Sequence, residues 1–179
     1  MYSVDLGQET HVKDQALWEQ ALAATRNIYA RLPPGCATEL DGLIEEIMRL
    51  KQNLVELVIA AGSANICQAC GGECCRYGRY HVSVLDIMAY LKSGAEPLTP
   101  DFSANPACPY SNLMGCTMAA RFRPMTCVVF NCQQVEDLLS PLQMQIARGY
   151  EQELRDAIGR AGQISGQRLD RALLLSCCS

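Results

Sequence analysis

The sequence predicts a mainly α-helical domain with a cysteine-rich, metal-organised central loop region and little or no β-structure. Apolar residues recur at helical spacing near both ends of the chain, a pattern typical of amphipathic helices. Five prolines interrupt residues 95–132, where no period is sustained. Eight of the eleven cysteines lie from Cys67 to Cys132. Because 49% of the 179 residues are hydrophobic, the chain can form its own core, and we expect one domain over residues 1–179.

The N-terminal third is expected to form a helical hairpin over about residues 8–61. The first helix should end where Pro33, Pro34 and Gly35 interrupt it. Thr38 is the expected N-cap of the second helix, with Asp41 as its capping-box partner, and Gly62 is the expected stop. The second helix has a wide apolar stripe, which indicates packing against more than one neighbour. The stripe consists of Leu40, Leu43, Ile44, Ile47, Leu50, Leu54, Leu57, Val58 and Ala61.

The remainder divides into a cysteine-cluster core at residues 65–133 and C-terminal helices at 134–175. The first cysteines are expected in a glycine-containing loop. Ser83 and Asp86 form a capping-box pattern at the start of a short helix that Gly94 ends. In the C-terminal part, Pro141 marks a kink or a new helix start.

Composition limits the partners and the compartment that we expect. The net charge of −4 and the pI near 5.2 argue against a nucleic-acid binder, which would have a basic face. The polar N-terminus does not resemble a signal peptide, and the most apolar stretch, 54–61, is too short to cross a membrane. We therefore expect a cytoplasmic protein that binds neither nucleic acid nor membrane. A protein partner remains open, and the sequence does not indicate the oligomeric state.

The clustered cysteines point to metal binding. Stable disulfides are rare in a reducing cytosol, and an odd number of cysteines cannot all pair within one chain. Cys67 and Cys70 have the Cys-x-x-Cys spacing that suits a tetrahedral ion or a cluster edge. Cys74 and Cys75 are adjacent, so their side chains diverge, which favours two sites or one polynuclear site. Zinc and an iron–sulfur cluster fit about equally. The candidate ligands are Cys67, Cys70, Cys74, Cys75, Cys108, Cys116, Cys127 and Cys132.

Other residues near the cluster receive secondary roles. His81 is a less favoured ligand or proton shuttle. Nearby arginines can offset the negative charge of a thiolate-bound metal; these are Arg76, Arg79, Arg121 and Arg123. Cys36 is isolated, which favours a small buried hydrophobe over a ligand. Cys177 and Cys178 lie in the tail, where a frayed end is the favoured interpretation.

The cysteine layout resembles the YkgJ-like cysteine-cluster family, a group of zinc- or iron-chelating domains with a CxxCxxCC motif. Here the motif runs over residues 67–75, with three residues rather than two between Cys70 and Cys74. The second half contains Cys-Pro-Tyr at 108–110, Gly-Cys at 115–116 and Arg-Pro-Met-Thr-Cys at 123–127. The resemblance covers roughly residues 65–133. It implies a metal or iron–sulfur site held by the eight cysteines, without implying a known reaction.

Three functions follow as hypotheses. The first is a metal-binding protein, zinc or iron–sulfur, whose site is at least structural and has up to two centres per chain. The second is an iron–sulfur redox or protein-modifying enzyme, because a related cysteine cluster occurs in flagellin lysine methylases. The third is an interaction module that docks through the helix at 38–61. Common nucleotide-binding, hydrolase and metalloprotease motifs are missing from the sequence.

Overall fold

The computed structural model describes residues 6–70, 75–104, 108–112 and 115–176, and it confirms a mainly α-helical fold with little β-structure. The longer helices are α1 (Leu6–Ala30), α2 (Pro34–Ala60), α4 (Val84–Lys92) and α7 (Pro141–Ser165). The shorter ones are α3 (Ser63–Ala69), α5 (Met125–Val129), α6 (Gln133–Glu136) and α8 (Leu173–Ser176), with 3₁₀ turns η2 (Gly78–Tyr80) and η3 (Ala120–Phe122). Strands β1 (Ser111–Asn112) and β2 (Gly115–Cys116) form the only sheet in this described part.

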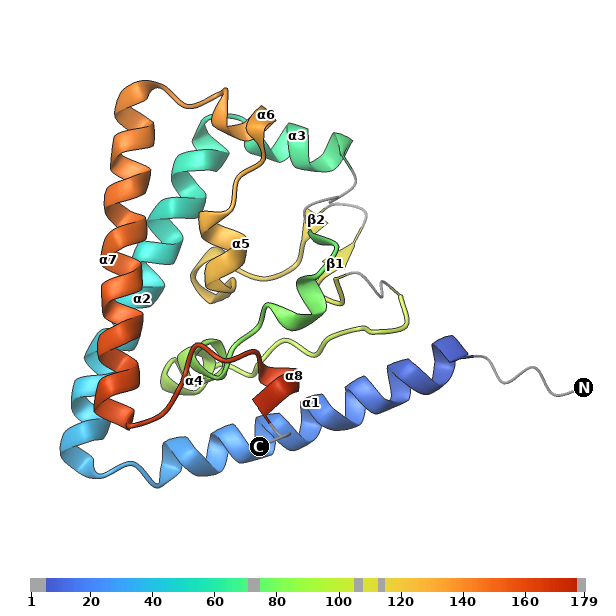
Figure 1. Cartoon of the computed structure of the whole chain (residues 1–179), viewed down its shortest axis with the longest axis vertical. Coiled ribbons are helices and arrows are strands. Elements are labelled where there is room, and N and C mark those ends of the chain that lie inside the picture. The colour runs from blue at the N-terminus through green and yellow to red at the C-terminus, as the bar shows by residue number, and fades with distance from the viewer. Residues whose placement is uncertain (1–5, 71–74, 105–107, 113–114, 177–179) are drawn as a thin grey trace, which may run out of the picture.

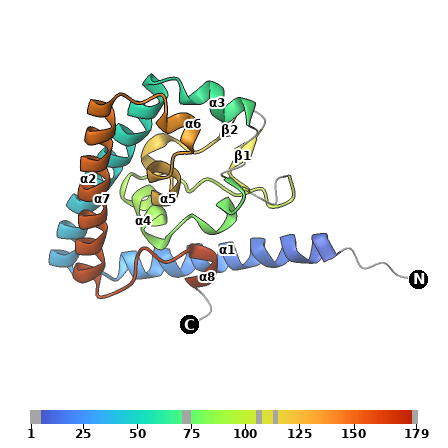
Figure 2. The same cartoon turned by 45° about the horizontal axis from the view of Figure 1, so that its top comes forward.

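The long helices frame the cysteine-rich segment. In Figure 1, α2 and α7 lie side by side along one edge, and α1 runs away from their common end along a second edge. The elements from α3 to α6 occupy the angle between these two edges, and Figure 2 shows the same arrangement after rotation. The helices expected to form a hairpin, α1 and α2, instead diverge from their junction, and α2 packs along α7.

The junction between α1 and α2 differs from the sequence-based expectation. The helix α1 ends at Ala30, just before the prolines, as predicted. However, α2 begins at Pro34 with Pro33 as its N-cap, so the prediction that Thr38 caps this helix is wrong. Proline fits the first helical position because its fixed φ suits the helix and its missing N–H has no partner to lose. The hydroxyl of Thr38 instead donates to the Pro34 carbonyl one turn earlier, at 3.1 Å.

The apolar stripe of α2 is used inside the molecule. Leu40, Ile44, Ile47 and Leu50 have no measurable exposure, and α2 contacts α7, α4, α5 and η3. From α7, Leu154, Ala157 and Ala161 are also fully buried. This confirms that the helix packs on several neighbours. Leu57, Val58 and Ala61, at the end of the stripe, are only half-buried, and the interaction-module hypothesis stays a prediction.

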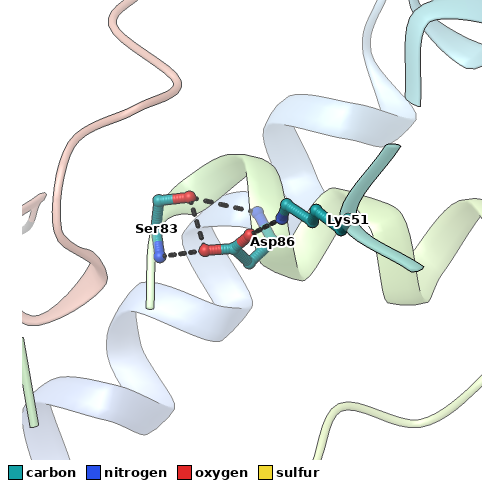
Figure 3. A network of polar contacts seen from close by, with 3 residues as sticks. All are labelled: Lys51, Ser83 and Asp86. Atoms are coloured by element: carbon teal, nitrogen blue, oxygen red, sulfur yellow. Dashed lines mark hydrogen bonds and ion pairs between the residues drawn. The ribbon is translucent and has the colours of Figure 1, made fainter. Parts of the chain in front are cut away.

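A buried ion pair joins α2 to α4. Figure 3 shows Lys51 reaching from α2 to the carboxylate of Asp86 in α4, and both side chains are at most 3% exposed. The other oxygen of Asp86 accepts hydrogen bonds from the backbone N–H and the hydroxyl of Ser83, at 2.8 and 2.7 Å. The Ser83 hydroxyl also accepts from the Asp86 backbone N–H, so the predicted capping box is confirmed. The carboxylate therefore serves both as a helix cap and as the partner of the lysine.

The C-terminal segment is bound to the start of α4 through its backbone. The N–H of Leu173 donates to the Val82 carbonyl at 2.7 Å, and the N–H of Val84 donates to the Arg171 carbonyl at 3.2 Å. Residue Ser83 also pairs with Ala172 in an isolated antiparallel bridge. Helix α8 then lies against α1 and η2. The end of the chain thus closes over the segment that links the two cysteine groups.

The remaining predictions at helix ends are mostly confirmed. Gly62 follows α2 with φ of 100°, and Gly94 follows α4 with φ of 65°, conformations that glycine adopts easily. Pro141 begins α7 at its first turn, next to a capping box made by Ser140 and Gln143. Among the described residues, no helix combines the length and the apolar character needed to cross a membrane.

Candidate metal centre

The first two cysteines of the motif lie on a short helix rather than in a loop. Cys67 is part of α3, and Cys70 is its C-cap residue, so the expectation of a loop over this segment is wrong from Ser63 to Ala69. Both cysteines are exposed. The Cys70 thiol donates to the Cys67 carbonyl at 3.5 Å, one helical turn away. Cys74, together with Gly71 and Gly72, falls outside the described residues.

Cys75 and Cys108 meet across the two cysteine groups. Their side chains are hydrogen-bonded, and the Tyr110 backbone N–H and the Ser111 side chain also lie within hydrogen-bonding reach of the Cys108 sulfur. These contacts, led by the one to Cys75, lower the pKa of Cys108 from 9.0 to about 6, although burial opposes them. Cys108 therefore has the character of a thiolate at neutral pH, which is the form that binds metals.

Gly78 allows Cys108 to take this position. A Cβ atom at Gly78 would lie 2.5 Å from the Cys108 sulfur and 2.7 Å from its Cβ. Real carbon atoms do not approach so closely, so any larger residue would push Cys108 away. Gly78 is buried and begins η2, three residues after Cys75. Glycine here matters for close packing rather than for an unusual φ.

Cys116 and Cys127 lie close to the same point. Cys116 is in β2, which pairs with β1 and so follows directly from the Cys108 turn. Cys127 is in α5, and its sulfur is 3.3 Å from Nδ1 of His81. Each cysteine has an exposed side, yet surrounding protein atoms raise the pKa of both thiols above the ordinary value. The charges of Cys116 and Cys108 raise the pKa of Cys127 further.

His81 is part of this region, although sequence reasoning gave it a minor role. Burial lowers its pKa, which favours the neutral ring. A neutral imidazole is the form that ligates zinc or iron. Its contact with Cys127 joins the end of η2 to α5. No sequence signal pointed to this contact, because the two residues come from separate segments.

The arginines fall into different surroundings. Arg123 lies close enough to Cys116 for its charge to lower the pKa of that thiol, and its Nε donates to the Met118 carbonyl at 3.2 Å. Arg79 forms an ion pair with Asp14 of α1 and lies over the Tyr80 ring. The exposed Arg121 lies over the Phe122 ring. The predicted charge compensation therefore has direct support at Arg123, while the Arg79 charge is matched by a carboxylate.

The other cysteines lie apart from this region or outside the described residues. Cys132 is the half-buried N-cap of α6, and α6 packs against α3, which carries Cys67. Cys36 is at the start of α2, at the opposite corner from α3 and the β-hairpin in Figure 1. It is half-buried. The tail pair Cys177 and Cys178 is not among the described residues.

The described donors meet in pairs rather than as a closed ligand set. Over residues 6–70, 75–104, 108–112 and 115–176, no three Cys, His, Asp or Glu side chains are placed to hold one metal ion. Four of the eight predicted ligands nevertheless influence one another: Cys75 contacts Cys108, and Cys108 and Cys116 act on Cys127. Their donor chemistry, thiols and one imidazole, fits zinc and iron–sulfur clusters.

Comparison with known proteins gives no relative from which a function can be transferred. No family model, no curated protein and no solved structure matches this chain.

Proposed function

We propose that this chain is a metal-binding protein in which cysteine thiolates hold zinc or an iron–sulfur cluster. The observation that carries the proposal is the contact of the Cys127 sulfur with Nδ1 of His81 at 3.3 Å, in a region where the charges of Cys108 and Cys116 also reach Cys127. Cys75 and His81 contact two of these three cysteines directly. Cysteine thiolates and imidazole from separate segments are the donors that zinc and iron–sulfur sites use.

The electrostatics of the region support an ion there. The Cys108 sulfur has the character of a thiolate, and its charge acts on both Cys116 and Cys127. Ionisation of Cys116 or Cys127 beside the Cys108 thiolate is unfavourable without a counter-charge, because like charges at short range repel each other. A bound cation removes this cost and lowers the pKa of every thiol that it contacts. The raised pKa of Cys127 keeps it in the thiol form, which suits a residue that ionises when the metal arrives.

The proposed role of the metal is at least structural. Residues 95–132 contain only short elements between stretches without regular structure, such as η3 and α5. In the described part of this segment, backbone bonds from Asp101 N–H to the Pro109 carbonyl and from Thr117 N–H to the Tyr110 carbonyl, both at 2.9 Å, join neighbouring stretches beside the two-residue strands. Metal ligation would add cross-links between these short elements, since the free energy of binding becomes free energy of folding.

The proposal divides the predicted ligands into two groups by position. Cys75, Cys108, Cys116 and Cys127 belong to the region around η2, β2 and α5, with His81 as an additional donor. Cys67 and Cys70 belong to α3, and Cys132 lies on the neighbouring α6.

Reconstitution with cysteine variants tests the proposal. The metal-free chain is titrated anaerobically with Zn²⁺ and, separately, with iron and sulfide, for the wild type and for Cys127→Ser and Cys36→Ser. We expect Cys127→Ser to bind less metal or to bind it at least about tenfold more weakly, a loss typical of disturbed metal sites. The Cys36→Ser control, at the far corner, should bind as the wild type does. Equal binding by both variants contradicts the assignment of Cys127.

A further inference from the structure

The turn η2 connects two candidate donors of the metal centre. Gly78, its first residue, lies against Cys108, because a Cβ atom there would be 2.5 Å from the cysteine sulfur. His81, which follows the turn, has its Nδ1 atom 3.3 Å from the Cys127 sulfur. The N–H of His81 donates to the Gly78 carbonyl at 3.1 Å, so the two contacts belong to one hydrogen-bonded turn. A shift of η2 therefore changes both contacts together.

Helix α1 holds this turn through an ion pair. The Nη2 atom of Arg79, the middle residue of η2, contacts a carboxylate oxygen of Asp14 in α1. The two side chains are 19% and 11% exposed, so solvent and salt screen the pair less than a surface pair. The Arg79 guanidinium also lies over the ring of Tyr80, 5.0 Å from its centre. Arg79 therefore fastens η2 to a helix that lies outside the cysteine-rich segment.

The pair is sensitive to the loss of either partner. An arginine keeps its charge in proteins, so a guanidinium without Asp14 would stay largely enclosed with no compensating charge. The Nε atom of Arg79 is already buried without a hydrogen-bond partner among the described residues, and it offers no second anchor for the side chain. Turning the side chain into water relieves the cost, and η2 then shifts with it. The Asp14 carboxylate therefore keeps Arg79, and with it the turn, against α1.

The C-terminal segment holds the chain just after the turn. Helix α8 contacts both η2 and α1, and the Val82 carbonyl accepts a hydrogen bond from the Leu173 N–H at 2.7 Å. This bond acts one residue beyond His81, whereas the ion pair acts on the turn itself. We therefore expect the C-terminal contacts to keep the chain folded when the ion pair is removed, while the exact position of η2 depends on the pair.

We propose that Asp14 and Arg79 are positioning residues of the metal centre, whose ion pair fixes η2 against α1 and so holds Cys108 and His81 in place for ligation. The inference rests on the proposed function, because it assigns the two residues to the cysteine site. It extends that site beyond residues 65–133 to the N-terminal helix. Residues that orient metal ligands from behind commonly change metal affinity by about 10–100-fold when they are replaced.

The test is an anaerobic titration of the metal-free, full-length chain with whichever of Zn²⁺ or iron with sulfide the wild type accepts. Asp14→Asn and Arg79→Gln should each bind at least about tenfold more weakly than the wild type. Because the pair acts as a unit, the double variant should lose little more than either single one. Arg79→Lys, which keeps the charge, should recover part of the affinity. The control Arg26→Gln removes a different ion pair of α1, to Glu96 at 2.8 Å, and should bind as the wild type does.

Amide hydrogen exchange of the metal-free chain provides a readout that needs no metal. The N–H groups of Tyr80 and His81 donate to the Tyr77 and Gly78 carbonyls, so their exchange reports on opening of η2. Asp14→Asn should speed this exchange about tenfold or more and leave that of α7 unchanged. Unchanged exchange at η2, or unchanged metal affinity in Asp14→Asn, overturns the inference and leaves the proposed function standing. A wild type that binds no metal contradicts the proposed function itself, and this result is recognised before any variant is compared.

Discussion

Lys51 of α2 and Asp86 of α4 form an ion pair with both side chains at most 3% exposed, and this pair joins α2 to the short helix that lies between the two cysteine groups. Removal of a single partner leaves a buried charge without compensation. We expect Asp86→Ala to lower the free energy of unfolding by about 3–5 kcal/mol, measured by denaturant titration. Replacement of both residues by apolar side chains should cost much less than the sum of the single changes.

An exposed pair provides the control for this prediction. Arg160 and Glu46 join α7 to α2 at 2.9 Å, with side chains 54% and 34% exposed. Solvent and salt screen such a pair, so Arg160→Ala should change the free energy of unfolding by no more than about 1 kcal/mol. An equal loss for the buried and the exposed pair would show that the burial of Lys51 and Asp86 has no energetic consequence.

Ser83, which caps α4, and Thr38, which was expected to cap α2, should contribute very different amounts to the stability of the protein. Ser83→Ala should cost roughly 1–2 kcal/mol of unfolding free energy, because the hydroxyl caps α4 and also donates to Asp86. Thr38→Ala should cost under about 0.5 kcal/mol, because this residue is inside α2 and its hydroxyl bonds only to the preceding turn. Thermal or denaturant unfolding of the two variants compares them directly. A larger loss for Thr38→Ala would restore the sequence-based assignment of the cap.

Core packing between α2 and α7 depends on one leucine of α7. Leu154 has no measurable exposure, whereas Leu142 on the same helix is 65% exposed. Leu154→Ala should therefore destabilise the protein by about 2–5 kcal/mol through the lost burial and the cavity left behind. Leu142→Ala should stay within about 0.5 kcal/mol. Denaturant titration of both variants measures the difference, and similar losses would argue against the observed packing of α7.

The metal-free protein should become more stable as the pH rises from about 6 towards 9. The pKa of Cys108 is lowered to about 6 in the folded chain, from 9.0, by its contacts with Cys75, Tyr110 and Ser111. For an acid with a depressed pKa, the stabilisation is complete above the unfolded pKa and is lost as the pH falls through the folded pKa. We expect the stability difference between wild type and Cys108→Ser to grow over this range.

Above pH 9, Cys116 and Cys127 should lower the free energy of unfolding rather than raise it. Burial raises the pKa of Cys116 and Cys127, so their ionisation in the unfolded chain favours unfolding at high pH. The metal-free stability curve should therefore rise and then fall. A curve for Cys108→Ser that matches wild type between pH 6 and 9 would contradict the thiolate character of Cys108.

Local features of the fold were predictable because their signals are local. The capping box at Ser83 and Asp86 depends on residues three positions apart, and Gly62 and Gly94 mark helix ends through their own φ angles. The same logic failed at Thr38. Its pattern with Asp41 matches a capping box, but Pro33 and Pro34 set an earlier start for the helix.

Contacts between residues far apart in the sequence could not be predicted from local sequence patterns. Nothing local indicates that Cys75 meets Cys108, or that His81 meets Cys127, because chain topology decides which turns come together. One signal was overlooked. Lys51 lies within the apolar stripe of α2, between Leu50 and Leu54, and a charge in such a position calls for a buried partner.

The most direct test of the account is the metal content of the full-length chain purified without oxygen, measured by elemental analysis together with its ultraviolet–visible spectrum. We predict at least about one zinc per chain in a colourless protein, or iron and sulfide with visible absorption that dithionite bleaches. A chain that carries only trace metal as purified, binds neither zinc nor iron with sulfide on reconstitution, and leaves all eleven cysteines free for alkylation would contradict it.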